Sequence, residues 1–488
     1  MPYDAAAMTE LLRDRAYVGG DWIPTDATFP VTDPATGEEV ARVPRCGEAE
    51  TRAAIASAEA ALPAWRATLA DERAAILRRL VALMEEHEDA LAHLLTREQG
   101  KPLREAKGEM AYARSFLTWF AEEARRVYGE TIPAHRKGAR LLVLRQPVGV
   151  TAAITPWNFP TAMITRKLGP ALAVGCTMVI KPAEATPLSA LALAALAEEA
   201  GVPKGVLHVL TGDREDAPTI GGVLTSDARV RKLSFTGSTA VGKALLEQCA
   251  GTVKRVSLEL GGNAPFLVFD DADVDAAVEG CMMAKFRNSG QSCVAANRIL
   301  VQAGVHDAFV EKLAARIDAL KTGPGLEDGV DVGPVIDERA VAKLERHVGD
   351  AKDKGAVVKL GGGRHALGRS FFEPSLLTGV TPEMVMTREE TFGPVAGVVR
   401  FETEEEALAI ANDAEVGLAS YFYARDVGRI WRVSEALESG MVGVNTGLVS
   451  TTVAPFGGIK ESGLGREGSR HGVDDWTELK YVCVDGLG

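Results

Sequence analysis

The sequence lacks the cysteine and histidine patterns of a metal site or a disulfide scaffold. Its 488 residues hold six scattered cysteines without a CxxC pair, and its eight histidines show no HxxxH or HxxEH spacing. We therefore predict that the protein has no metal site and that its thiols are reduced, as in a cytoplasmic protein. The cysteines are Cys46, Cys176, Cys249, Cys281, Cys293 and Cys483.

An excess of basic residues is also missing. Lys and Arg total 54 against 67 Asp and Glu, a formal net charge of −13, so the large basic surface that binds nucleic acid or an anionic membrane is not expected. The uncharged stretches 146–165 and 439–459 contain prolines or glycines that argue against a membrane helix. The first residues lack the basic start and apolar run of a signal peptide. We expect no nucleic acid or membrane partner and a cytoplasmic location.

The remaining composition is that of an ordinary globular protein, with 46% apolar and 25% charged residues and no repeat. Residues 48–130 have helical spacing of leucines. After them, short apolar runs alternate with helical patterns, which predicts an α/β fold with parallel sheets covered by helices. The predicted strands are 150–154, 177–180, 207–210, 233–236, 255–260 and 266–269, and the predicted helices include 163–174, 188–199 and 243–249.

Two β-rich segments, 140–146 and 478–484, interrupt this alternation. We interpret both as sheet edges that pair between subunits, which predicts a homo-oligomer.

Two strand ends carry residues suited to a nucleotide. Gly237 and Ser238 follow strand 233–236 and precede a helix, whose free N–H groups can bind phosphate. A plain strand–helix turn is the alternative. Lys181 and Glu184 follow strand 177–180, where a parallel sheet presents its ligand crevice, and both can bond ribose hydroxyls. Alternatively, Lys181 is solvated and Glu184 serves the positive end of the next helix.

Three further residues suit nucleophilic chemistry. Cys293 lies in a polar segment, where an accessible thiol with its thiolate favoured by nearby N–H groups is one interpretation and an inert core cysteine the alternative. Glu259 ends an apolar strand, where burial would raise its proton affinity and suit a general base, unless it faces water at a sheet edge. Asn158 lies in a turn between prolines, where its amide can donate to an oxyanion or bond its own backbone.

Taken in order, these segments resemble the aldehyde dehydrogenase superfamily from about residue 16 to residue 484. The resemblance implies a Rossmann-like NAD(P)-binding domain, an α/β catalytic domain and a small β oligomerisation element, as a dimer or tetramer. The corresponding ranges are 1–130 with 148–260, 261–465, and 131–147 with 470–488. The motifs are PWNFP (156–160), KPAEATP (181–187), FTGST (235–239), ELGGN (259–263), GQSC (290–293) and EETFGPV (389–395).

The resemblance also implies roles for single residues. Cys293 would be the nucleophile, Asn158 and the Cys293 N–H the oxyanion hole, and Glu259 the base that activates water for thioester hydrolysis. The implied NAD-binding residues are Thr155, Trp157, Lys181, Glu184, Gly237, Ser238, Leu260, Glu390 and Phe392.

Segments 163–167, 285–291 and 456–468 are similar to the succinate-semialdehyde dehydrogenase branch of the superfamily. There Arg166, Arg287 and Ser450 would hold the remote carboxylate of the substrate, since guanidinium–carboxylate bonds are charge-assisted. Structural ion pairing of the arginines is the alternative. Glutarate semialdehyde and 2-oxoglutarate semialdehyde stay open as substrates, because one methylene changes binding by only about 1–3 kcal/mol. A broad aliphatic aldehyde dehydrogenase is a further alternative.

Two other classes are weighed against this prediction: a non-catalytic protein on the same fold, and a thiol hydrolase that ignores NAD. Cys293 together with Glu259 disfavours the first, and Ser238 together with Glu390 disfavours the second.

Glu184 predicts NAD rather than NADP, because its charge would repel a 2′-phosphate about 4 Å away by several kcal/mol. Some relatives carry a second cysteine two residues after the nucleophile and form a disulfide there. Ala295 stands at that position here, so no such disulfide is expected.

Overall fold

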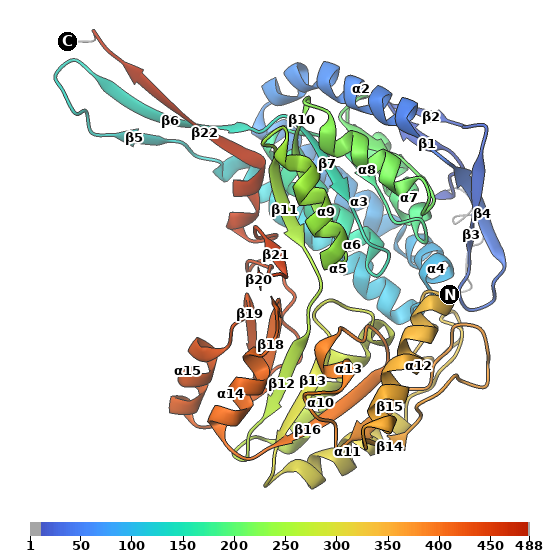
Figure 1. The fold of residues 1–488 in the computed structure, drawn as a ribbon. Coiled ribbons are helices and arrows are strands. Elements are labelled where there is room, and N and C mark those ends of the chain that lie inside the picture. Colours follow the sequence, from blue (N-terminus) through green and yellow to red (C-terminus); the bar gives the residue numbers. More distant parts are fainter. Residues whose placement is uncertain (1–10, 487–488) are drawn as a thin grey trace.

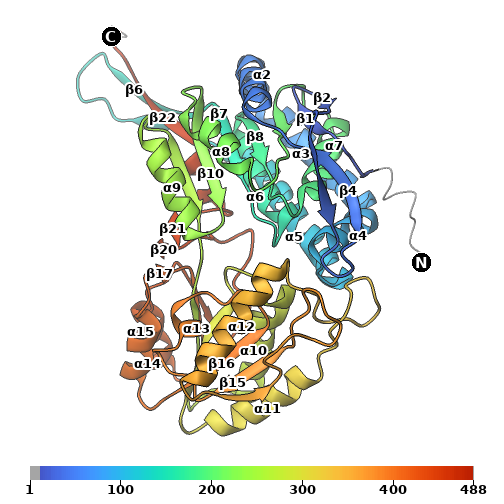
Figure 2. The same ribbon diagram turned by 45° about the vertical axis from the view of Figure 1, so that its right-hand side comes forward.

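Residues 11–486 are described by a computed structural model, which has two large sheets, each covered by helices, and a projecting β arm (Figures 1 and 2). The predicted α/β class is therefore confirmed. None of the helices in the described range is both long and apolar enough to cross a membrane.

The first sheet has eight strands in the order β2-β1-β9-β8-β7-β10-β11-β21. Its central strands β9, β8, β7, β10 and β11 run parallel, so their carboxyl ends lie at one edge of the sheet. β8 is buried along its whole length, as expected for a parallel strand with helices on both faces. The strands are β1 (Ala16–Val18), β2 (Asp21–Ile23), β7 (Val150–Ile154), β8 (Thr177–Lys181), β9 (Leu207–Val209), β10 (Val230–Thr236), β11 (Arg255–Glu259) and β21 (Gly463–Leu464).

The predicted helical region 48–130 forms four consecutive helices, and four more lie between the strands of this sheet. α6 begins at Pro160, three residues before the predicted start, because a proline in the first turn loses no hydrogen bond. The helices are α2 (Glu48–Ala67), α3 (Ala70–Glu86), α4 (Glu88–Gln99), α5 (Leu103–Glu123), α6 (Pro160–Val174), α7 (Pro187–Glu199), α8 (Ala217–Ser226) and α9 (Thr239–Ala250).

The second sheet has seven strands in the order β14-β15-β16-β13-β12-β18-β19, and the chain enters it directly after β11 (Figure 1). All of its pairings except β14–β15 are parallel. The strands are β12 (Ala264–Val268), β13 (Ala296–Gln302), β14 (Val357–Leu360), β15 (Ser375–Thr378), β16 (Val395–Phe401), β18 (Ala419–Tyr423) and β19 (Met441–Val444).

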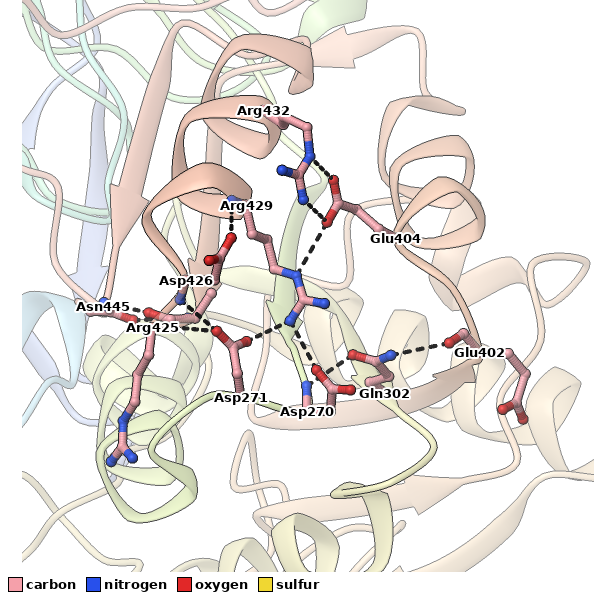
Figure 3. A network of polar contacts seen from close by, with 11 residues as sticks. Asp270, Asp271, Gln302, Glu402, Glu404, Arg425, Asp426, Arg429, Arg432 and Asn445 are labelled. Carbon is pink, nitrogen blue, oxygen red and sulfur yellow. Dashed lines mark hydrogen bonds and ion pairs between the residues drawn. The ribbon is translucent and has the colours of Figure 1, made fainter.

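Helices on this second sheet include α10 (Val274–Phe286), α11 (His306–Asp318), α12 (Glu338–Asp353), α13 (Val385–Arg388), α14 (Glu404–Asn412) and α15 (Val427–Ala436). Arg429 at the start of α15 donates to Asp270 at 2.9 Å, Asp271 at 2.6 Å and Glu404 at 3.1 Å (Figure 3). This network ties α14 and α15 to the turn that follows β12.

The projecting arm consists of β5 (Glu130–Ile132), β6 (Arg140–Pro147) and β22 (Thr477–Val484). Both segments predicted as strands are confirmed, but they pair with each other within the chain, from Thr477 opposite Pro147 to Val484 opposite Arg140. β22 and β5 are the edge strands of this sheet, so the predicted pairing between subunits stays a prediction. Two short pairs complete the fold, β3 (Thr28–Thr32) with β4 (Glu39–Pro44), and β17 (Val416–Gly417) with β20 (Ile459–Lys460).

Candidate active site

The predicted site residues gather where the two large sheets meet. Asn158, Lys181, Gly237 and Glu259 lie at the carboxyl ends of β7, β8, β10 and β11, the edge at which parallel sheets bind ligands. Cys293 lies on the loop before β13 in the second body.

The backbone of the loop that carries Cys293 has little freedom to move. It follows a short 3₁₀ helix, η2 (Arg287–Gly290), in which Asn288 and Ser289 have φ of +53° and +55°, a strained conformation for residues with side chains. Gly262 packs against the loop so closely that a Cβ there would lie 2.4 Å from the Cys293 carbonyl oxygen. Only glycine therefore fits at position 262.

The Cys293 thiol is half-buried, and its pKa is raised to about 12. Burial is the main cause, and the carboxylates of Glu390 and Glu259 add to it. Arg166 and the Cys293 N–H lower the pKa, but by less. The expectation of a favoured thiolate is therefore wrong for this structure, and the thiol needs a base in order to react. All six cysteines are free.

Asn158 is buried against the loop that carries Cys293. Its Nδ2 donates to the Gln291 carbonyl at 3.1 Å, and its own carbonyl accepts from Asn288 Nδ2 at 2.9 Å and from Lys101 Nζ at 2.7 Å. Its Oδ1 also accepts from the Phe159 N–H at 3.2 Å, so the local backbone bond expected as the alternative is present as well. One Nδ2 proton is left for a ligand.

A fully buried ion pair supports this turn from behind. Lys101 Nζ lies 2.6 Å from Glu109, and both side chains are completely inaccessible. Glu109 also accepts the N–H of Thr161 at 2.9 Å, in the first turn of α6. Hydrogen bonds with Lys101, Asn288 and Gln291 therefore fix the position of Asn158.

Glu259 is 4% exposed, and β21 covers the strand that carries it, so the alternative of a water-facing edge residue is wrong. Its pKa is raised well above the usual value by burial and by Glu467, while Arg166 and Lys167 act in the opposite direction. Oε2 has no hydrogen-bond partner among residues 11–486. The predicted increase in proton affinity is confirmed.

Arg166 is 2% exposed and lies between two phenylalanines. Its guanidinium carbon is 3.9 Å from the Phe456 ring centroid and 5.3 Å from that of Phe116. Nε lies 2.8 Å from Glu467, which also pairs with Lys167. The structural ion pair expected as the alternative therefore exists, but Nη2 has no hydrogen-bond partner in the described part of the chain.

Arg287 is placed differently. It is half-buried, its Cζ lies 5.5 Å from the Phe159 ring centroid, and it forms no ion pair or side-chain hydrogen bond with any described residue. Ser450 is half-buried in the loop after β19. Of the two arginines, only Arg287 thus forms no salt bridge with a described residue, although the charge of the buried Glu105 acts on it through space.

The nucleotide-side residues surround the carboxyl ends of β7 and β8. Lys181 is 3% exposed and its Nζ donates to the Pro182 carbonyl at 3.1 Å, so the alternative of a solvated lysine is wrong. Burial lowers the Lys181 pKa, and Glu184, half-buried before α7, opposes this effect. Thr155 donates its N–H to the Lys181 carbonyl at 3.1 Å, while its Oγ1 is buried without a partner in the described structure.

The turn after β10 leaves a helix N-terminus open. Ser238 caps α9 by accepting the Val241 N–H at 3.4 Å and is itself exposed. Gly237 donates to the Glu259 carbonyl at 3.0 Å. A Cβ at Gly242 would lie 2.4 Å from Leu260, so α9 packs closely on the strand end. These exposed N–H groups and the unpartnered Thr155 hydroxyl fit a dinucleotide, with its phosphates at the N-terminus of α9.

Glu390 connects this region to Cys293. Its Oε1 accepts the Gly262 N–H at 3.2 Å, and burial raises its pKa to about 7 against the opposing charges of Lys343 and Lys285. Phe392 has φ of +56°, and its ring meets Trp157 edge-on with centroids 5.5 Å apart.

Sequence reasoning missed Glu467, Lys343 and Lys285. Glu467 lies in segment 456–468, quoted for the resemblance, but nothing local marks a buried carboxylate there. Among residues 11–486, no three His, Cys, Asp or Glu side chains gather in a way that could hold a metal ion.

Comparison with known proteins places this site in a family. The family model described as "Aldehyde dehydrogenase family" matches residues 22–482. The chain belongs to the aldehyde dehydrogenase family, as its motifs suggested.

Individual relatives match over almost their full length. The chain is 61% identical over 480 residues to the glutarate-semialdehyde dehydrogenase of Pseudomonas aeruginosa, covering 98% of this chain and 99% of the relative. It is 59% identical over 478 residues to the succinate-semialdehyde dehydrogenase (NADP(+)) GabD of Escherichia coli, covering 98% of each. The crystal structure of succinate-semialdehyde dehydrogenase from Burkholderia pseudomallei superposes with a TM-score of 0.96 at 60% identity, covering 98% of this chain and 99% of the other.

Proposed function

We propose that this enzyme oxidises a short ω-carboxy aldehyde, foremost succinate semialdehyde, to the carboxylic acid. The observation that carries this proposal is Arg287, a half-buried guanidinium without a salt bridge or side-chain hydrogen bond in the described structure, on which Glu105 acts only through space. An unpaired charge in such a place is costly unless a ligand pairs with it. Arg166 presents its free Nη2 within electrostatic reach of Cys293. The names of the curated relatives point to the same substrate class.

The reaction begins at Cys293, whose raised pKa requires that a base remove the thiol proton. Two carboxylates with raised proton affinity act on this thiol, Glu259 and Glu390, and we assign the role of base to Glu259 because Glu390 is engaged by the Gly262 N–H. The sulfur adds to the aldehyde carbon, and the resulting oxyanion accepts hydrogen bonds from Asn158 Nδ2 and the Cys293 N–H. Losing one such donor typically costs about 10²–10³-fold in rate.

The bound nicotinamide supplies a hydride acceptor, so that the adduct becomes a thioester on Cys293. Once Glu259 has released the thiol proton to solvent, it takes a proton from water, and the hydroxide displaces the Cys293 sulfur as thiolate to release the carboxylic acid. Glu390 and Phe392 would hold the nicotinamide ribose, Lys181 and Glu184 the adenosine ribose, and Ser238 the pyrophosphate. Thr155, Trp157, Gly237 and Leu260 would line the same cofactor site.

NAD is the expected cofactor, because Glu184, proposed to bond the adenosine ribose, would repel the 2′-phosphate of NADP. The E. coli relative carries NADP(+) in its name, so NADP is the alternative cofactor.

The domains are assigned in the same proposal. Residues 1–130 and 148–260 form the NAD-binding domain, 261–465 the catalytic domain, and 131–147 with 470–488 the oligomerisation element of a cytoplasmic dimer or tetramer. β21 lies within the range of the catalytic domain but pairs with β11, so the carboxyl end of that range also completes the first sheet.

The test is a kinetic comparison of succinate, glutarate and 2-oxoglutarate semialdehydes with propanal, followed by NADH absorbance. A preference for the acidic aldehydes supports the proposal, and an equal rate with propanal favours a broad aliphatic aldehyde dehydrogenase instead. Cys293→Ala should abolish all aldehyde-dependent NADH formation, and retained activity would refute the mechanism.

A further inference from the structure

A tyrosine outside every motif of the sequence lies beside the two arginines. Tyr112 is on α5, and its hydroxyl is buried without a hydrogen-bond partner in the described structure. A buried hydroxyl without a partner loses the bonds it makes in water, at a cost of several-fold to a hundredfold in stability, so such groups are rare. The Tyr112 hydroxyl is therefore available to donate to a bound molecule.

Ring contacts place Tyr112 next to Arg166. Its ring centroid is 4.8 Å from that of Phe116, at an interplanar angle of 64°, and the Arg166 guanidinium lies 5.3 Å from the Phe116 ring on the same helix. α5 and α6, which carry Tyr112 and Arg166, pack against each other.

Electrostatics extend this neighbourhood to the reacting sulfur. Burial raises the Tyr112 pKa, and the charges that act on it are Arg166 and Arg287, which lower it, followed by Cys293 and Glu467, which raise it. At neutral pH the hydroxyl is thus a neutral donor, and the two charges that affect its pKa most are the arginines expected to bind a carboxylate.

A second tyrosine, which the charges of Arg287 and Cys293 also affect, serves as an internal comparison. Tyr421 is also influenced by Arg287 and Cys293, but its hydroxyl donates to the Val294 carbonyl at 2.8 Å. Tyr421 therefore has a structural role in the Cys293 loop, whereas Tyr112 does not have such a bond.

We propose that the Tyr112 hydroxyl donates a hydrogen bond to the remote carboxylate of the substrate, as a third donor beside Arg166 and Arg287. The inference rests on the proposed function, because it needs an acidic aldehyde. Tyr112 is then a specificity-determining residue that touches the substrate at the end opposite to the aldehyde. A hydrogen bond to a charged group is strong enough that its loss lowers binding by about 10- to 100-fold.

The test compares Tyr112→Phe with the wild type on succinate semialdehyde and on butanal, which has the same chain length without a carboxylate. Tyr128→Phe is the matched control, since Tyr128 is 70% exposed. We expect Tyr112→Phe to lower kcat/KM for succinate semialdehyde about 10- to 100-fold through KM, with butanal unchanged. Equal losses on both substrates, or no loss on either, would overturn the inference.

A binding measurement provides a readout without turnover. Succinate, the product, should raise the Tm of the wild type, and this rise should shrink in Tyr112→Phe while the Tm of the unliganded variant stays equal or increases. A clear fall in the unliganded Tm, with the succinate effect intact, would show a structural hydroxyl and overturn the inference.

The two proposals fail in different ways. A wild type that prefers succinate semialdehyde over butanal while Tyr112→Phe keeps that preference overturns only the role of Tyr112. A wild type without any preference overturns the proposed substrate class and the role of Tyr112 with it.

Discussion

Glu467 raises the proton affinity of Glu259, although the two residues are 208 positions apart in the sequence. Burial of Glu467 is outweighed by its pairing with Lys167 and Arg166, so its pKa is lowered and it stays ionised. One buried carboxylate is thus held negative by two cations, and its charge helps to keep the neighbouring carboxyl able to take a proton.

The first prediction concerns this pair. A base with a raised pKa loses activity as the pH falls through that pKa, so the acid limb of kcat against pH reports Glu259. Glu467→Gln removes a negative charge and frees two cations, and both changes lower the Glu259 pKa. We expect the acid limb to move to lower pH. Glu478→Gln, at an exposed ion pair, should leave the profile in place, and an unmoved profile in Glu467→Gln would contradict the coupling.

The second prediction concerns the support behind Asn158. Lys101→Met leaves Glu109 buried and uncompensated, which should lower the free energy of unfolding by about 3–5 kcal/mol. It should also lower kcat, because Asn158 loses a fixing contact. Lys204→Met is the matched control: Lys204 and Asp21 form an exposed pair at 2.9 Å, whose loss should cost less than about 1 kcal/mol. Denaturant unfolding of both variants checks this. Equal losses of unfolding free energy in Lys101→Met and Lys204→Met would contradict the stabilising role of the buried Lys101–Glu109 pair.

The third prediction concerns the pH dependence of cofactor binding. The Glu390 pKa is raised to about 7, so the carboxyl is mostly protonated at pH 6 and mostly ionised at pH 8. Because the ionised form is the better acceptor for ribose hydroxyls, NAD binding should tighten up to about tenfold between these values. Glu390→Gln should bind more weakly and without this slope. Titrations with NAD, followed by tryptophan fluorescence at several pH values, test this. An identical pH dependence of NAD binding in Glu390→Gln would show that another group causes it.

The fourth prediction concerns cofactor choice. Glu184→Ser removes the charge expected to repel a 2′-phosphate, so kcat/KM with NADP should rise at least tenfold relative to NAD. Glu199→Ser, on the exposed end of α7, is the control and should leave the ratio unchanged. Comparable wild-type values with both cofactors would refute the assigned role of Glu184.

The strands and helices that carry the site were predictable, because their signals are local. β7 and β8 are mostly apolar runs, and the helix predicted at 243–249 exists as α9, although it begins four residues earlier, at Thr239. The N-terminal strands β1 to β4 and helix α8 were not predicted. β1 and β2 are only three residues long, and α8 contains two glycines, Gly221 and Gly222, which lower its helix propensity.

The parts of the site that sequence reasoning missed depend on distant partners. Glu467 is paired with residues 300 positions away, and the unpartnered hydroxyl of Tyr112 becomes visible only when α5 packs on α6. The thiolate expected at Cys293 was wrong for the same reason. The Cys293 N–H lowers the thiol pKa as expected, but burial and the carboxylates of Glu390 and Glu259 raise it by more. Burial and these two carboxylates cannot be inferred from segment 287–293.

The most direct test of the central claim is the ratio of kcat/KM for succinate semialdehyde to that for propanal, in the wild type and in Arg287→Met. Loss of the charged donor should reduce the ratio about 10- to 150-fold by acting on the acidic aldehyde alone. Arg400→Met, at an exposed ion pair, should keep the wild-type ratio. An Arg287→Met enzyme with an unchanged ratio would contradict the proposal that this unpaired arginine binds the substrate carboxylate.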